Sequence, residues 1–194
     1  MRVIAGLAKG KVLAAPEGRR TRFTSDLLRG SLFNILGQDL TGKSFLDVFA
    51  GVGSVGIEAL SRGAEPVVFV ENDRQNLNYI RANLKHCGLT GKAQILPLSF
   101  KQSLGKLSSP DYIFLDPPYS VYKIENILQD LMQHAILSHF CVTIVEHSKK
   151  DVVPRRLANL NLTRDRVYGQ TVLSFYKIAQ MSADKKKQIH ADYP

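Results

Sequence analysis

A tetrapeptide whose residue types could hold a planar amine follows the apolar run 112–115: Asp116, Pro117, Pro118 and Tyr119. A carboxylate accepts hydrogen bonds from an NH2 group, and the two prolines fix the backbone while the Pro117 carbonyl offers a second acceptor. Two acceptors at a strand end can orient an exocyclic amine and expose its lone pair, and Tyr119 offers a face for stacking a base. The tetrapeptide suits nucleophilic attack by nitrogen, whereas an Asp-Pro pair alone indicates only that a strand stops.

A second motif, far upstream, points to a cofactor. Residues 47–56 read Asp-Val-Phe-Ala-Gly-Val-Gly-Ser-Val-Gly and lie between an expected strand and an expected helix. Glycines here let the backbone turn tightly and approach a ligand, which on its own would suggest a dinucleotide. Asp47 argues against that ligand because a carboxylate repels a pyrophosphate. It can instead order water or bind the cationic amino-acid portion of S-adenosylmethionine.

A further acid follows the next expected strand. Glu71 is placed to bind two ribose hydroxyls, and Asn72 can assist it. The alternative is that Asp47 and Glu71 are merely solvated acids at strand ends. Because ligands bind at the carboxyl ends of parallel strands, Asp47, Glu71 and Asp116 together indicate transfer of a methyl group to an amine.

The elements that must position these residues alternate between strands and helices. We expect strands at 44–49, 66–71, 93–96, 112–115 and 140–146, and helices at 54–62, 73–87 and 121–134. This alternation of strands and helices predicts an α/β fold with a doubly wound, mostly parallel sheet. A final pair of strands, 164–168 and 171–178, would add an antiparallel hairpin at one edge.

Three segments make up the predicted domain organisation. Residues 1–43 form an extension with a small hairpin (2–5 with 11–14) and a helix that begins at Asp26 and ends at Gly37. Residues 44–178 form the α/β domain. Residues 179–194 lose the apolar pattern and contain three consecutive lysines, which indicates a mobile basic tail.

Composition and length restrict the class of protein. A chain of 194 residues with 44% hydrophobic content fits a globular protein of ordinary size. It has no apolar run near 18 residues and no signal-peptide pattern, so we expect a cytoplasmic protein without a membrane span. Cys87 and Cys141 lack metal-ligand or disulfide spacing, so we expect structural thiols and no metal site.

The charge of the chain favours a polyanionic partner. It has 26 Lys and Arg against 17 Asp and Glu, a formal net charge of +9. Residues 1–43 alone hold eight basic and three acidic side chains, and part of this excess is the loop at 19–22. A basic surface of this kind is typical of nucleic-acid binding.

The order of these motifs resembles the RsmD-type family of bacterial 16S ribosomal RNA guanine-N2 methyltransferases, over about residues 1–178. The segments that carry the resemblance are Val3 to Gly6 with Gly10 and Pro16, Arg22 with Thr24, Asp26 and Arg29, 32–36, 47–64 and 116–119. The resemblance implies a Rossmann-like fold, S-adenosylmethionine as methyl donor, and one guanine in 16S rRNA or an assembling small subunit as acceptor. We expect a monomer.

The resemblance also implies roles for individual residues. Asp116, the Pro117 carbonyl and Tyr119 would hold a flipped guanine, with Pro118 fixing the turn. The residues implied to hold the cofactor are Asp47, Phe49, Ala50, Gly51, Gly53, Glu71 and Asn72, with Ser99 near the adenine. The residues implied to contact RNA are Arg19, Arg20, Arg22, Thr24 and Arg29.

The chain departs from the family pattern at two positions, and other functions stay open. Phe23 stands where the family usually has proline, and Gly30 where it usually has glutamate. A DNA adenine-N6 methyltransferase would use the same tetrapeptide chemistry, and a protein-amine or glutamine methyltransferase is a further option. A non-catalytic RNA-binding module would explain the charge but not the acids at the strand ends.

Overall fold

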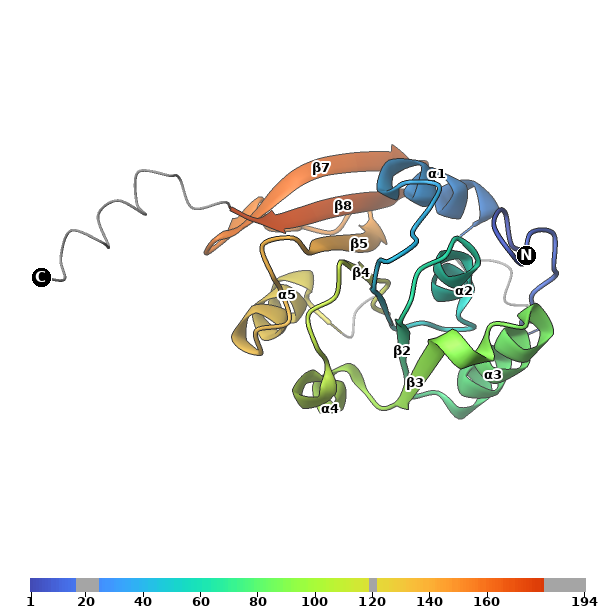
Figure 1. Ribbon diagram of the computed structural model, residues 1–194. Coiled ribbons are helices and arrows are strands. Elements are labelled where there is room, and N and C mark those ends of the chain that lie inside the picture. The colour runs from blue at the N-terminus through green and yellow to red at the C-terminus, as the bar shows by residue number, and fades with distance from the viewer. Residues whose placement is uncertain (17–24, 119–121, 180–194) are drawn as a thin grey trace, which may run out of the picture.

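An eight-stranded sheet forms the centre of the computed structural model, which describes residues 1–16, 25–118 and 122–179 (Figure 1). The strand order is β3-β2-β1-β4-β5-β8-β7-β6. The strands are β1 (Phe45–Val48), β2 (Val67–Glu71), β3 (Ala93–Pro97), β4 (Tyr112–Leu115), β5 (Val142–Ser148), β6 (Arg156–Leu157), β7 (Leu160–Tyr168) and β8 (Thr171–Ile178). Strands β1 to β5 are parallel, and β8, β7 and β6 are antiparallel. The predicted mostly parallel sheet with an antiparallel C-terminal hairpin is confirmed.

Helices cover both faces of the sheet, so the domain has three layers (Figure 1). One face carries α1 (Asp26–Leu36), α2 (Ser54–Ser61) and α3 (Arg74–Cys87), and the other carries α4 (Phe100–Ser103) and α5 (Ile124–Gln133). Two short 3-10 turns, η1 (Thr90–Lys92) and η2 (Leu104–Lys106), connect elements. Successive residues of β1 alternate between the two cores, since Phe45 packs with the first helix group and Leu46 with the second.

The predicted limits of α1 and α3 are confirmed to within a residue by their caps. Ser25 Oγ accepts a hydrogen bond from the Leu28 N–H at 3.1 Å, and α1 ends at Gly37. Asp73 Oδ1 accepts from the Asn76 N–H at 2.8 Å at the start of α3, and Gly88 ends that helix in the left-handed conformation. Local side-chain chemistry therefore sets these boundaries.

The predicted N-terminal hairpin is present and packs against the end of α2. Arg2 and Val12 form an antiparallel bridge, and the Leu7 N–H donates to the Ser61 carbonyl at 2.7 Å. Gly6 has φ +79°, and a Cβ at this position would lie 1.7 Å from Ser61 O. Only glycine permits that approach. The hairpin thus contacts the α/β domain directly, while the division at residue 43 stays a prediction.

The second half of the chain contains one helix and one strand that the sequence pattern did not predict, and one strand that is longer than predicted. Helix α4 has four residues and β6 has two, which is too short for a periodic pattern. Strand β7 begins at Leu160 rather than at residue 164. A register shift between Leu162 and Arg164 interrupts its pairing with β8 and hides the alternation.

The described residues contain no helix long and apolar enough to cross a membrane. Both cysteines are buried and free. Burial raises the pKa of Cys141 to about 11, so its thiol stays neutral at neutral pH.

Candidate active site at the carboxyl ends of the strands

The acidic residue of the tetrapeptide lies beside the end of β1. Val48 pairs with Leu115, and the next residue, Asp116, donates its backbone N–H to Val48 O at 3.5 Å. Leu115 also pairs with Val145, which places Glu146 of β5 next to Asp116. Alternation along each strand puts Asp47, Asp116 and Glu146 on the sheet face that carries α1, α2 and α3.

The loop after β1 is held in an unusual backbone conformation. Phe49 has φ +61°, Gly51 +55° and Gly53 +81°. The Ala50 N–H donates to Val70 O at 3.1 Å, so the loop is joined to β2. A non-glycine residue at positive φ is uncommon, and its presence at Phe49 shows that the surroundings force this turn.

Two of the three glycines from 51 to 56 serve packing, and one leaves space. A Cβ on Gly56 would lie 2.3 Å from the Phe69 ring, and one on Gly53 would lie 3.2 Å from Ile80. A Cβ on Gly51 would meet nothing within 4 Å. Gly56 and Gly53 therefore bring α2 close to its neighbours. The backbone at Gly51 instead faces open space that a ligand can approach.

Glu71 holds the glycine loop and the next helix together. Its Oε2 accepts from the Gly51 N–H at 2.8 Å and from Asn76 Nδ2 at 3.4 Å. Its Oε1 accepts from the Asn72 and Asp73 N–H groups, each at 2.8 Å. The four bonds engage the hydrogen-bonding positions of both oxygens, and the bond from Asn76 is the weakest.

Asp47 is a buried acid under the start of α2. Its side chain accepts from the Gly56 N–H at 2.8 Å. Burial raises the pKa of Asp47 to about 8, the Gly56 hydrogen bond opposes this, and the charges of Glu71 and Glu146 add to the rise. The carboxyl group is thus largely protonated at neutral pH, and a cation bound nearby would favour its ionised form.

The remaining residues of the tetrapeptide differ in exposure. Asp116 is half-buried, Pro117 is buried and Pro118 is exposed. Tyr119 lies outside the described residues. The same holds for four of the residues expected to contact RNA, which are Arg19, Arg20, Arg22 and Thr24.

Arg29, the fifth residue expected to contact RNA, is fully buried. Its Nη2 donates to Arg2 O at 2.6 Å and to Asp26 Oδ1 at 2.9 Å, and its Nε lies 3.8 Å from Glu58 Oε2. Glu58 also accepts from the N–H groups of residues 4 and 5. This geometry assigns Arg29 to anchoring the hairpin on α1 and α2 and does not favour direct contact with RNA.

Two residues expected near the cofactor have local roles. Ser99 Oγ caps α4, since it accepts from the Gln102 N–H at 3.4 Å and donates to Gln102 Oε1 at 2.9 Å. The Asn72 side chain is exposed, and its backbone N–H is bound to Glu71. Neither position excludes a ligand contact, and both roles stay predictions.

The structure reveals a buried amide that the sequence pattern did not single out. Asn83 of α3 donates from Nδ2 to Val52 O at 3.1 Å and to Ala14 O at 3.0 Å. Its Oδ1 accepts from the Ala14 N–H at 2.8 Å. Asn83 thus joins the N-terminal extension to the glycine loop. A polar residue on the apolar side of an otherwise amphipathic helix was the available signal.

An aromatic cluster borders the same edge of the sheet. The Phe49 ring lies 5.6 Å from that of Phe100 and 5.2 Å from that of Tyr122, measured between centroids. Phe100 is buried, and the other two rings are partly buried. The cluster packs the glycine loop against the segment after β4, so the two halves of the site share an apolar wall.

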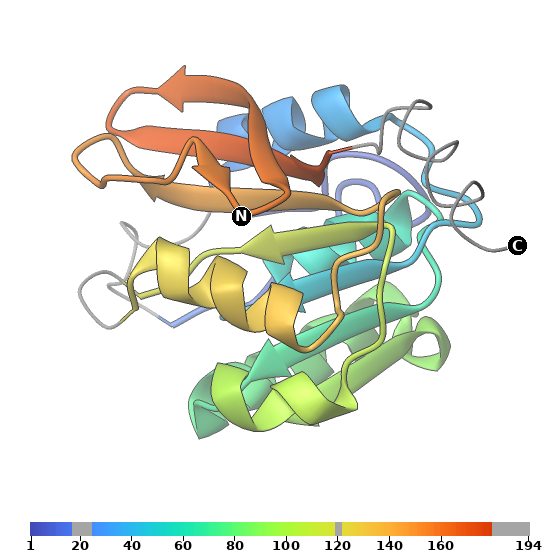
Figure 2. The same cartoon turned by 90° about the vertical axis from the view of Figure 1, so that its left-hand side faces the viewer.

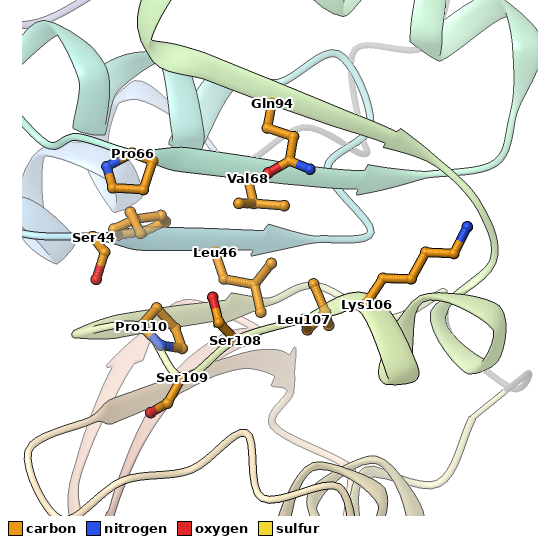
Figure 3. Close-up of a pocket in the computed structure, with 11 residues that line it drawn as sticks. Ser44, Leu46, Pro66, Val68, Gln94, Lys106, Leu107, Ser108, Ser109 and Pro110 are labelled. Atoms are coloured by element: carbon orange, nitrogen blue, oxygen red, sulfur yellow. The ribbon is translucent and has the colours of Figure 1, made fainter.

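A pocket at the opposite edge of the sheet has a different character (Figure 3). It is lined at the amino ends of the strands by residues that include Ser44, Pro66, Gln94, Lys106 and Pro110. The lining residues include no carboxylate, and the charged residue among them is Lys106. The pocket therefore lies apart from the acids at the carboxyl ends.

The chain matches known proteins over most of its length. The family described as "Conserved hypothetical protein 95" matches residues 1–177. A relative from Bacillus subtilis, YlbH, is 36% identical over 91% of this chain and 98% of its own length. Ribosomal RNA small subunit methyltransferase D of Escherichia coli is 30% identical over 91% and 89% of the two chains. The solved structure of yhhF from Escherichia coli has 28% identity and a TM-score of 0.82, and the match covers 93% of this chain and 99% of that chain.

Proposed function

Because the chain belongs to the RsmD-type family of ribosomal RNA methyltransferases, we propose that it methylates the exocyclic N2 amine of one guanine in 16S rRNA. The proposed methyl donor is S-adenosylmethionine. The observation that carries the proposal is the contact between Asp116 and the end of β1, because it sets the amine-binding tetrapeptide beside the glycine loop. One edge of the sheet can thus bring donor and acceptor together.

The glycine loop and the acids around it fit a cationic nucleoside cofactor. Gly51 leaves space for the ligand, and Glu71 fixes the loop. A ribose hydroxyl can replace the long bond from Asn76 to Glu71 without breaking the three short ones. Asp47 lies buried beneath the loop, and its ionised form would favour the positive charge of the cofactor.

The residues after β4 would position the acceptor. Asp116 and the Pro117 carbonyl accept the two N–H bonds of the amine and orient its lone pair. Tyr119 would stack on the flipped base, which offsets the few kcal/mol that unstacking costs. When bound, S-adenosylmethionine supplies an electrophilic methyl group on a sulfonium, which leaves as a neutral thioether.

Electrostatics assists the transfer. As nitrogen forms the new bond to carbon, positive charge grows on the amine, and the Asp116 carboxylate stabilises it. The amine then loses one proton and returns to neutrality, with Asp116 as the nearest acceptor for it. No covalent enzyme intermediate is needed, since neither motif contains a cysteine or histidine.

Nucleoside mass spectrometry of 16S rRNA tests the proposal. RNA from a strain that lacks the gene should lose one N2-methylguanosine, and the purified protein should restore it with labelled cofactor. Restoration by wild type but not by an Asp116→Ala variant is expected. Unchanged N2-methylguanosine in the deletion strain, with loss of N6-methyladenine from DNA instead, would establish the adenine alternative.

Calorimetry with S-adenosylhomocysteine separates the enzyme from a non-catalytic RNA-binding module. The enzyme should bind this product in the absence of RNA, because the loop is already held by Glu71. No detectable binding, together with retained RNA binding, would favour the module.

A further inference from the structure

The C-terminal antiparallel part of the sheet carries a second concentration of positive charge. Residues 149–179 contain seven basic and two acidic side chains, whereas residues 44–148 contain eight basic and ten acidic ones. All seven basic side chains of this segment are exposed: Lys149, Lys150, Arg155, Arg156, Arg164, Arg166 and Lys177. Residues 44–148 thus have a small acidic excess, and the segment that follows them is strongly basic.

The two acids of this region do not neutralise it. Asp165 Oδ1 accepts from Ser174 Oγ at 2.6 Å, and Asp151 Oδ2 accepts from the Ser148 N–H at 2.8 Å. Within the part of the chain that the structure describes, none of the seven basic side chains has a carboxylate within ion-pair distance. Their charge is available to an external anion.

Strand register places two of the arginines on the face of the candidate active site. Arg166 pairs with Leu173, and Leu173 pairs with Glu146, which lies next to Asp116. Directly opposed residues point to the same face, so Arg166 and Arg164 lie on the face of Asp116. Three strand spacings of about 4.8 Å separate Arg166 from Asp116, or about 14 Å.

Two lysines lie at the same edge of the sheet. Ser148 pairs with Thr171 at the carboxyl end of β5, and the Lys149 N–H donates to Gln170 O at 2.8 Å. Lys149 and Lys150 therefore flank the turn between β7 and β8, which lies on the same side as the arrowhead of β4 (Figure 2). These basic residues thus lie at the edge of the sheet where the parallel strands end. The residues of the proposed chemistry lie at the same edge.

We propose that Lys149, Lys150, Arg164 and Arg166, called here the β7 basic surface, bind the phosphate backbone of the substrate rRNA beside the target nucleotide. The proposal rests on the proposed function. Phosphate contacts hold a nucleic acid in register without reading its sequence. Charged side chains, lysine especially, also protect an exposed strand edge from unwanted pairing, but that purpose does not require them on the face and edge of the candidate active site.

A matched pair of double variants tests the β7 basic surface. Lys150→Gln with Arg166→Gln removes one lysine and one arginine from it, and Arg81→Gln with Lys106→Gln removes the same charges elsewhere. The first variant should raise KM for 16S rRNA by on the order of tenfold and leave kcat within about twofold. It should also lower the slope of log affinity against log salt by about 1.5, because two phosphate contacts are lost.

The control variant should match wild type in KM, salt slope and affinity for S-adenosylhomocysteine. Equal melting temperatures would show that both variants fold. Wild-type KM and salt slope in the first variant would overturn the proposal. So would an effect confined to assembled subunits, because it would indicate a protein partner rather than RNA.

Anisotropy of a labelled 16S rRNA fragment separates failure of this inference from failure of the proposed function. RNA binding is measured without cofactor and does not require methyl transfer. A reduced salt slope in the first variant, together with a wild-type protein that methylates no rRNA, would reject the methyltransferase proposal and retain the RNA surface. An unchanged slope with active wild type would reject the surface alone.

Discussion

The parallel half of the sheet and its antiparallel half use charge in opposite ways. In the parallel half, acids are buried and hold backbone N–H groups, as Glu71 does at Gly51 and Asp47 at Gly56. In the antiparallel half, basic side chains are exposed, as at Arg164 and Arg166. The pairing of β5 with β8 is the boundary between them. Under the two proposals made above, the first half would bind the cofactor and the amine, and the second would offer charge to a polyanion.

The largest expected effect comes from the acceptor side of the parallel half. Asp116→Ala should lower methyl transfer at saturating cofactor by about 10²–10³-fold, because it removes the carboxylate that stabilises positive charge on nitrogen. Affinity for S-adenosylhomocysteine and the salt slope of RNA binding should stay unchanged. Single-turnover methylation measures the effect, with Asp130→Asn on α5 as control. A variant as active as wild type would contradict the proposed mechanism.

A second substitution tests the cofactor side. Glu71→Gln keeps the shape of the side chain but turns one acceptor oxygen into a donor facing N–H groups. We expect affinity for S-adenosylhomocysteine to fall by about 10²-fold, since a buried donor without an acceptor costs roughly 1–3 kcal/mol. Calorimetry measures the change, and Glu125→Gln on the outer side of α5 is the matched control. Wild-type affinity would show that Glu71 does not fix the loop.

A third substitution tests the link between the extension and the parallel half. Asn83→Ala removes the three hydrogen bonds that the Asn83 side chain makes to the backbone of Ala14 and Val52. It should lower the free energy of unfolding by about 2 kcal/mol, because buried backbone groups lose their partner. Urea denaturation measures the loss, and exposed Asn78→Ala is the control. Equal stability of the two variants would mean that water replaces the amide.

A fourth substitution tests the pH dependence of stability that comes from Asp47. Its pKa is raised to about 8 in the folded protein, so the folded state holds a proton that the unfolded state releases near pH 4. Stability from this group is present below pH 4 and is lost as pH rises towards 8. Asp47→Asn should remove a slope of up to about 1.4 kcal/mol per pH unit in that window.

Denaturant unfolding at several pH values between 5 and 8 measures the slope. Asparagine can still accept from the Gly56 N–H, so the variant should fold. Exposed Asp73→Asn would be a poor control because Asp73 caps α3, and Glu125→Gln on the outer side of α5 serves better. A variant that follows the wild-type slope would show that Asp47 ionises normally.

Local patterns predicted most of the parallel half correctly. Asp26 and Gly37 marked the ends of α1, and the apolar run 112–115 marked β4 with Asp116 directly after it. These signals are caps and apolar alternation. They depend on residues that are close in sequence, so the tertiary structure does not alter them. The start of β7 at Leu160 was not predicted. A bulge in this strand interrupts the alternation of side chains between the two faces of the sheet.

The burial of Arg29 shows what local patterns do not indicate. The resemblance implied that Arg29 contacts RNA, and the basic excess of residues 1–43 agreed with that role. Its partners, Arg2 and Glu58, are 27 and 29 positions away in the chain, so no local pattern indicates its burial. Glu146 was missed for the same reason, since only the pairing of β4 with β5 brings it beside Asp116.

The sequence by itself determined the α/β alternation, the glycine loop after β1 and the tetrapeptide that begins at Asp116 after β4, because residue type and short spacing specify each of them. Only the tertiary structure decided that Glu71 holds Gly51, that Asn83 joins the extension to the loop, and that Arg164 and Arg166 share a face with Asp116. Those relations depend on strand order and register, which bring distant segments together through contacts that no local spacing records.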